Sequence, residues 1–134
     1  MAIDYELLYS FIEQILHFQG FIRWIRIANK YGVLLAVKQR DGLKPLMTEE
    51  ENDEYAASAI KRHTTRIKYQ RKIGKLKYAI GKYEKINRVT IPINQDYYLL
   101  FTLDRNEQNY DDLITSNILS FVDKYREKFH FDEE

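Results

Sequence analysis

Residues 48 to about 72 carry the longest uninterrupted helical signal in the chain, and that helix limits how the rest can fold. Thr48 is followed by three glutamates, and this pattern is typical of a capping box. In such a box the Thr48 hydroxyl accepts from the Glu51 backbone N–H while the Glu51 side chain reaches back to the backbone of Thr48. Acidic residues fill the first two turns and basic residues the second half, as the helix dipole favours. We therefore expect one long helix over 48–72, ended by Gly74.

The apolar face of this helix is narrow, about one 100° sector at the helical period. Its two alanines allow a close approach to a sheet. The members of this face are Ala56, Ala59, Ile60, His63 and Ile67. A neighbouring flank is amphipathic and consists of Tyr55, Arg62, Arg66, Tyr69 and Ile73.

Periodicity assigns the other elements. Helical spacing of apolar residues predicts a first helix over 3–18, ended by Gly20, and a last helix over about 110–128, capped by Asn109 with Asp111 and Asp112 in its first turn. Runs of β-rich residues predict a hairpin of strands 21–29 and 33–38 that turns at Gly32, a loop over 40–47, and three further strands at 76–83, 86–91 and 97–103. Residues 131–134 form an acidic tail.

The composition of two strands predicts their places in the sheet. The strand at 97–103 is apolar on both faces, as a central strand covered on both sides must be. The strand at 76–83 alternates, and the lysines Lys75, Lys77 and Lys82 are the kind that protect a sheet edge. We expect an α+β fold of order α-β-β-α-β-β-β-α, with a five-stranded antiparallel sheet. The first and last helices cover one face and the long helix the other, in a single domain over 1–134.

No arrangement of residues points to an enzyme. The chain has no cysteine, which excludes a disulfide scaffold, a thiolate zinc site and a cysteine nucleophile. Its single, scattered glycines form no phosphate-binding loop, and its serines fall inside helical runs. His17, His63 and His130 have no partners at metal-ligand spacing, and a hydrogen-bonded core or interface histidine is the expected state of His63. We expect no catalytic residue, cofactor, metal site or small-molecule substrate, and an early acidic interruption of the apolar N-terminus predicts a soluble, cytoplasmic protein.

The most informative charge feature is the segment 61–88, where eleven Lys or Arg residues accompany one acid, Glu84. Tyrosines interleave with these bases, which suits contact with nucleic acid or an acidic membrane surface. The alternative is a helix whose basic end matches its dipole, followed by a protected edge strand. A net charge of only +1 favours this second interpretation.

The order of elements resembles the roadblock/dynein-light-chain superfamily of the profilin-like architecture. The resemblance rests on the hairpin closing at Asn29-Lys30-Tyr31-Gly32-Val33-Leu34 and the small-residue helix that follows. The segment 32–103 is also similar to a set of small archaeal proteins. Its similar parts are Tyr31-Gly32-Val33-Leu34-Leu35, Leu43-Lys44-Pro45-Leu46 before the helix cap, and Tyr78-Ala79-Ile80.

The resemblance implies a homodimer in which the long helices lie side by side and the strands at 76–83 pair into one sheet. We expect burial of Ala56, Ala59, Tyr55 and Tyr69 against the twin helix to drive this association. It also implies a non-catalytic regulator or scaffold of a protein partner such as a small GTPase or a signalling complex. Lysines facing each other across the two-fold axis would weaken the strand pairing. The residues expected to bind the partner are Tyr55, Ala59, Arg62, Arg66, Tyr69, Lys75 and Lys77.

Overall fold

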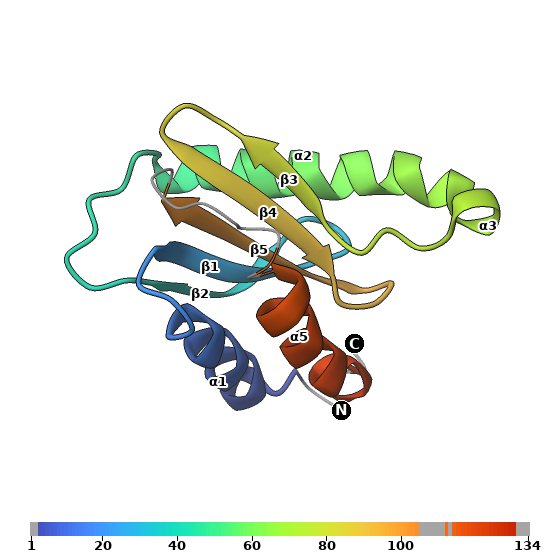
Figure 1. The fold of residues 1–134 in the computed structure, drawn as a ribbon, viewed down its shortest axis with the longest axis horizontal. Coiled ribbons are helices and arrows are strands. Elements are labelled where there is room, and N and C mark those ends of the chain that lie inside the picture. Colours follow the sequence, from blue (N-terminus) through green and yellow to red (C-terminus); the bar gives the residue numbers. More distant parts are fainter. Residues whose placement is uncertain (1–2, 105–111, 113, 131–134) are drawn as a thin grey trace.

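The computed structural model describes residues 3–104, 112 and 114–130. Its helices and strands follow the expected order along the chain (Figure 1). They are α1 (Tyr5–Leu16), β1 (Ile22–Asn29), β2 (Leu34–Gln39), α2 (Glu49–Arg66), α3 (Gln70–Ile73), β3 (Ala79–Lys82), β4 (Ile86–Pro92), β5 (Tyr97–Asp104) and α5 (Leu119–Tyr125). Short 3₁₀ turns at Ile67–Tyr69 and Arg126–Lys128 and a π turn at Ile114–Ile118 join or extend the helices.

The five strands form one antiparallel sheet in the order β2-β1-β5-β4-β3. β5 lies in the middle, and all of its residues from Tyr97 to Leu103 are buried. This confirms the prediction drawn from its apolar character on both faces. β2 and β3 form the two edges of the sheet.

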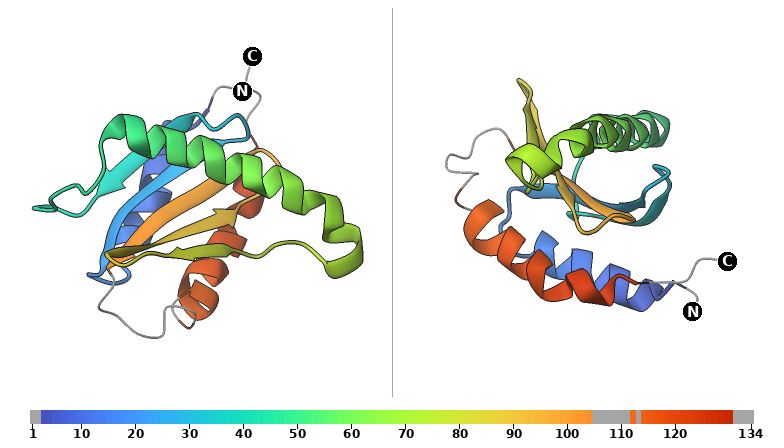
Figure 2. Two further views of the ribbon diagram at one scale, coloured as in Figure 1. Left: turned by 90° about the horizontal axis from the view of Figure 1, so that it is seen from above. Right: turned by 90° about the vertical axis from the view of Figure 1, so that its right-hand side faces the viewer.

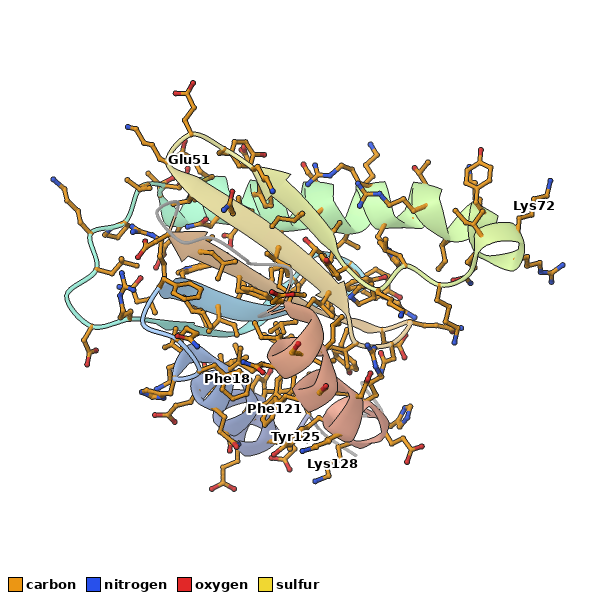
Figure 3. The ribbon with its side chains drawn as sticks, in the orientation of Figure 1. Phe18, Glu51, Lys72, Phe121, Tyr125 and Lys128 are labelled. Carbon is orange, nitrogen blue, oxygen red and sulfur yellow. The ribbon has the colours of Figure 1, made fainter. Side chains whose placement is uncertain are left out.

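Helices cover both faces of the sheet, α2 on one side and α1 with α5 on the other, which confirms the expected α+β architecture (Figure 2). The larger core lies on the α1 and α5 side, where Phe121 of α5 stacks 5.4 Å from Phe11 of α1, centroid to centroid. Phe18, Phe121 and Tyr125 meet between these two helices (Figure 3). The smaller core lies under α2 and consists of Ala28, Ala56, Ala59, Ile60, Tyr98 and Leu100.

The long helix begins as predicted and continues less regularly. Thr48 Oγ1 accepts from the Glu51 N–H at 3.1 Å, and Glu51 Oε1 accepts from the Thr48 N–H at 2.9 Å, so the capping box is present. The prediction of one α-helix to residue 72 is wrong after Arg66, where a 3₁₀ turn precedes the short α3. Neither piece has a buried residue, so no core packing holds this end in regular α geometry. Gly74, with φ of 90°, ends the helical region.

The edge strand β3 is shorter than the predicted 76–83, and Pro92 explains why. In the observed register Ala79 lies opposite Thr90, so Lys77 would lie opposite Pro92. Proline has no N–H to donate to such a pair, and the ladder stops before it. Lys75 and Lys77 therefore precede the strand, and Lys82 alone of the three lysines lies in it.

The last helix also departs from the prediction of one α-helix over about 110–128. Its described part runs from the π turn through α5 to a 3₁₀ turn. Ile114, Ile118, Leu119 and Val122 are buried along this segment. The predicted cap Asn109 and Asp111 lie outside the described residues, as does the acidic tail at 131–134.

The β1–β2 turn holds α2 at close range. Asn29 Oδ1 accepts from the backbone N–H of Tyr31 at 2.9 Å and of Val33 at 3.1 Å, which closes the turn. Gly32 has φ of +82°, and a Cβ added there would lie 2.9 Å from the Cα of Ala57 in α2. A side chain at this position would therefore collide with the helix backbone.

Candidate partner-binding surface and adjacent groove

Four of the seven residues predicted to bind a partner meet at one crevice. Tyr55, Ala59, Arg62 and Arg66 of α2 line a space of about 150 Å³ against β3 and β4. The other three, Tyr69, Lys75 and Lys77, are exposed and belong to the segment that leads from α2 to β3. The structure thus places the predicted residues along the α2 and β3 side of the molecule.

The expectation that Ala56 and Ala59 pack against a second long helix needs correction. Their exposed fractions are 1% and 3%, and both pack in the core between α2 and the sheet. The small side chains of Ala56 and Ala59 let α2 approach the sheet closely. Because they are buried there, they are not available for contact with a second long helix. A contact at this helix must instead use its outer flank.

Tyr55 joins α2 to the β3–β4 hairpin. Its ring lies 3.6 Å from the guanidinium carbon of Arg88 and 5.4 Å from that of Arg62. Burial raises the pKa of the Tyr55 hydroxyl, and its hydrogen bond with Tyr83 raises the pKa further. Tyr55 therefore keeps its proton at neutral pH and acts as a neutral hydrogen-bonding side chain.

Large apolar side chains lie exposed on the segments that precede and follow β3. The exposed fractions are 58% for Tyr69, 84% for Ile73 and 53% for Tyr83. No described residue pairs with the outer edge of β3, so this edge also presents backbone groups. Because the Tyr83 N–H donates to the Ile86 carbonyl, the alternation of an antiparallel ladder turns the N–H groups of Ile80 and Lys82 outward. This surface thus has both apolar side chains and backbone donors available to another chain.

The bases of the segment 61–88 fall into two groups. Ten of the eleven are exposed, among them Lys72 at the end of the helical region far from Glu51 (Figure 3). Arg88 differs, because its exposed fraction is 5%. The sequence pattern grouped it with the other ten bases and gave no sign that it is buried.

Arg88 belongs to a groove that the sequence analysis did not find. This groove has a volume of about 870 Å³ and lies between the first turns of α2, the loop 40–47 and the sheet. Arg26 of β1 and Arg88 of β4 reach it from the sheet, and both are buried. The guanidinium carbon of Arg26 lies 3.0 Å from the ring centroid of Trp24, and that of Arg88 lies 5.6 Å from it.

Arg26 is short of partners in this groove. Among the described atoms, its Nε and Nη1 have no hydrogen-bond partner, and the Asp53 carboxylate lies 3.9 Å from Nη1. Burial, and next the charge of Arg88, lower the pKa of Arg26 to about 9. The guanidinium still carries its charge at neutral pH.

One sequence signal could have located this pair. Arg26 lies between Ile25 and Ile27, in a strand whose other residues are mostly apolar on both faces. The alternation of a strand puts Trp24, Arg26 and Ala28 on one face, the face that α2 covers. An arginine on a covered face is unusual enough to mark a site.

Other site types are not formed by the described residues. His63 is buried, its Nδ1 has no hydrogen-bond partner there, and its ring packs edge-on against Tyr98. Within residues 3–104, 112 and 114–130, no three His, Cys, Asp or Glu side chains gather as metal ligands would. None of the helices in this part of the chain has the length and apolar character needed to cross a bilayer.

Comparison with solved structures decides the fold. A structure of MglB with a tetrameric arrangement superimposes with a TM-score of 0.72 at 14% identity and covers 96% of each chain. The Roadblock/LC7 domain from Streptomyces avermitilis gives 0.66 at 11% identity, covering 96% of this chain and 98% of its own. The protein has the roadblock fold.

The wider architecture agrees with this. Profilin II of Acanthamoeba castellanii matches the roadblock fold of this chain with a TM-score of 0.61 at 10% identity, over 92% of this chain and 99% of profilin. No protein-family model and no curated protein matches the sequence. The likeness therefore lies in the fold, and the predicted resemblance is confirmed at that level.

Proposed function

We propose that the protein is a non-enzymatic, homodimeric module that regulates or scaffolds a protein partner, such as a small GTPase or a signalling complex. One observation carries the proposal: in this roadblock fold no described residue pairs with the outer edge of β3, and Tyr69, Ile73 and Tyr83 are exposed on the segments that precede and follow this strand. The tetrameric arrangement of MglB supports self-association of this fold. In the proposed dimer the β3 strands pair across a two-fold axis and continue the sheet, while the outer flank of α2 contacts its twin.

The observed length of β3 favours such pairing more than the sequence suggested. Lys75 and Lys77 lie outside the strand. Of the three lysines, only Lys82 would therefore lie in the paired part of β3, near the Lys82 of the second copy. Like charges directly opposite one another weaken a pair of strands, and removing two of them from the ladder reduces that cost. The outward N–H groups of Ile80 and Lys82 supply the backbone hydrogen bonds.

The test is the molar mass of the protein in solution, measured by light scattering on a gel-filtration column at micromolar concentration. We expect a dimer. Lys82→Pro removes an outward N–H without removing a bond of the β3–β4 ladder, and should shift the protein toward the monomer. Lys77→Pro, just before the strand, is the matched control and should remain dimeric.

A second pair of variants tests the side-chain part of the contact. Tyr69→Lys places a charge in the apolar surface and should weaken the dimer, whereas Tyr5→Lys, at a tyrosine of similar exposure on α1, should not. A monomer for the unmodified protein at micromolar concentration would refute the proposed dimer.

The basic segment supports a second candidate, an anion-binding domain that contacts nucleic acid or an acidic membrane. Ten exposed bases over 61–88 favour it, and no ion pair between described residues neutralises any of them. Such binding must weaken steeply as salt rises, because it releases counterions. Titration against fluorescent single-stranded RNA and acidic liposomes at two salt concentrations tests this candidate. Absence of salt-sensitive affinity for both would rule it out.

A further inference from the structure

We propose that the groove under the first turns of α2 binds a small molecule that joins one carboxylate to an apolar body. The proposal does not depend on the dimer. It rests on the two buried arginines, on the distant ion pair of Arg26 and the neutral partners of Arg88, and on the walls of the groove. It concerns a bound ligand, and no reaction is proposed for it.

Arg26 needs a partner that the described part of the chain does not supply. The exposed fraction of Arg26 is 3%, and its Nε and Nη1 have no hydrogen-bond partner there. Asp53 lies 3.9 Å from Nη1, beyond hydrogen-bond distance, and 65% of its own side chain is exposed. Buried charges in proteins are normally both paired and hydrogen-bonded, because desolvation is costly otherwise. A ligand carboxylate in the groove would place a further counter-charge near Arg26.

Arg88 adds a second buried cation to the same wall. Its Nη1 and Nη2 each lie 3.4 Å from Asn52 Oδ1, and Nη1 lies 3.0 Å from the sulfur of Met47. These partners are neutral, and within the described ranges no carboxylate lies at ion-pair distance from Arg88. The charge of Arg88 also disfavours the charged form of Arg26. An anion bound beside the two would relieve this repulsion.

The rest of the groove is suited to an apolar body. Its volume of about 870 Å³ exceeds what one small ion needs and falls in the range of small-molecule sites, which are mostly apolar with a few polar groups. Its apolar lining comes from three strands and the loop 40–47 and comprises Trp24, Leu34, Val37, Leu43, Pro45, Leu46, Met47 and Ile86.

The acidic residues of the groove select the charge of the ligand. Glu49, Glu51 and Asp53 line it at the start of α2, and Glu51 is engaged in the capping box. These carboxylates would repel a ligand with several negative charges, such as a nucleotide. They would tolerate a single carboxylate held between Arg26 and Arg88.

Trp24 makes the proposal directly measurable. It is the one tryptophan of the chain, and it lies in the groove against Arg26. Its fluorescence should change saturably as octanoate is added to the full-length protein. Octanol and inorganic phosphate, which carry the apolar body or the charge alone, should each bind at least about tenfold more weakly.

Three variants separate the groove from other surfaces. Arg26→Met keeps the apolar stem and removes the charge, and should weaken octanoate binding by about tenfold or more. Arg71→Met makes the same exchange at an exposed residue of α3 and should leave binding unchanged. Leu46→Asp adds a charge to the apolar wall at a residue with 51% exposure, so it should weaken binding without requiring any change in the buried arginines.

Four results would overturn the proposal: no saturable change with octanoate, equal affinity for octanol, equal affinity for phosphate, or unchanged octanoate affinity in a folded Arg26→Met protein. Where Arg26→Met fails to fold, Leu46→Asp decides in its place. Self-association measured in parallel tells failure of this proposal from failure of the proposed dimer.

Discussion

The close approach of the β1–β2 turn to α2 predicts a large difference between two glycine substitutions that change the chain in the same way. Gly32 and Gly42 both have positive φ, +82° and +73°. A Cβ at Gly32 would lie 2.9 Å from the Cα of Ala57, whereas a Cβ at Gly42 would meet nothing within 4 Å. Gly42→Ala therefore reports the cost of the backbone conformation alone, and Gly32→Ala reports that cost plus a collision with a helix.

The magnitudes follow from these two terms. Holding an alanine in the left-handed region costs about 1–2 kcal/mol. Restriction of the unfolded chain by the new Cβ returns about 0.4–1 kcal/mol. Gly42→Ala should therefore destabilise by about 1 kcal/mol. Forcing extra volume against packed atoms costs about 1–3 kcal/mol more, so Gly32→Ala should lose about 2–4 kcal/mol.

Urea unfolding followed by far-ultraviolet circular dichroism measures both variants against the parent. The expected result is a lower urea midpoint for Gly32→Ala than for Gly42→Ala, with similar slopes. The contact atom at Gly32 is backbone, which cannot rotate away as a side chain would. Equal losses for the two variants would show that the turn does not press on α2, and would refute this account of how the helix is held.

Two further predictions concern α2. Thr48→Ala removes the acceptor for the Glu51 N–H and should lower the free energy of unfolding by about 0.5–2 kcal/mol, whereas Thr65→Ala, exposed within the helix, should have a smaller effect; urea unfolding compares them. Burial, and next the charge of Arg66, lower the pKa of His63 below its ordinary value of 6.5, so the unfolded chain takes up this proton at a higher pH than the folded chain. The contribution of His63 to stability is therefore complete above pH 6.5 and is lost as the pH falls from there toward the lowered pKa. His63→Leu should reduce the loss of stability between pH 8 and pH 5, measured by urea unfolding at both pH values. A pH dependence unchanged by His63→Leu would contradict the shift.

Local patterns predicted the parts of the fold that depend on local interactions. The capping box at Thr48 needs only residues three apart, and the Gly32 turn closes within five residues of Asn29. The central position of β5 could also be predicted, because only a strand covered on both faces can be apolar on both. These features survive in the structure with little change.

Features that depend on register and on long-range packing could not be predicted in the same way. β3 begins only after Lys77, which would lie opposite Pro92, and this is visible only once the pairing of β3 with β4 is known. Ala59 had two possible partners in the sequence, the sheet and a second helix, and periodicity cannot tell one apolar neighbour from another. In the structure Ala59 packs against the sheet.

The groove was missed for a related reason. Arg26 and Arg88 come from strands separated by β5, and Trp24 and Arg88 both lie opposite Thr102 of that strand. Only the assembled sheet brings them together, and only the loop 40–47 and the start of α2 cover them. A charge count along the sequence grouped Arg88 with the ten exposed bases, because such a count has no information on burial.

Spin-label distances between two copies test the proposed dimer most directly. The chain has no cysteine, so Lys82→Cys on β3 or Lys38→Cys on β2 carries a single label. If the two copies pair through β3, the two labels at residue 82 lie on neighbouring strands and should show strong dipolar broadening. The two labels at residue 38 then lie on the outermost strands of the continuous sheet, about 40 Å apart. A long separation at 82 with a short one at 38 would place the contact at the opposite edge. No dipolar coupling at either position would contradict the dimer altogether.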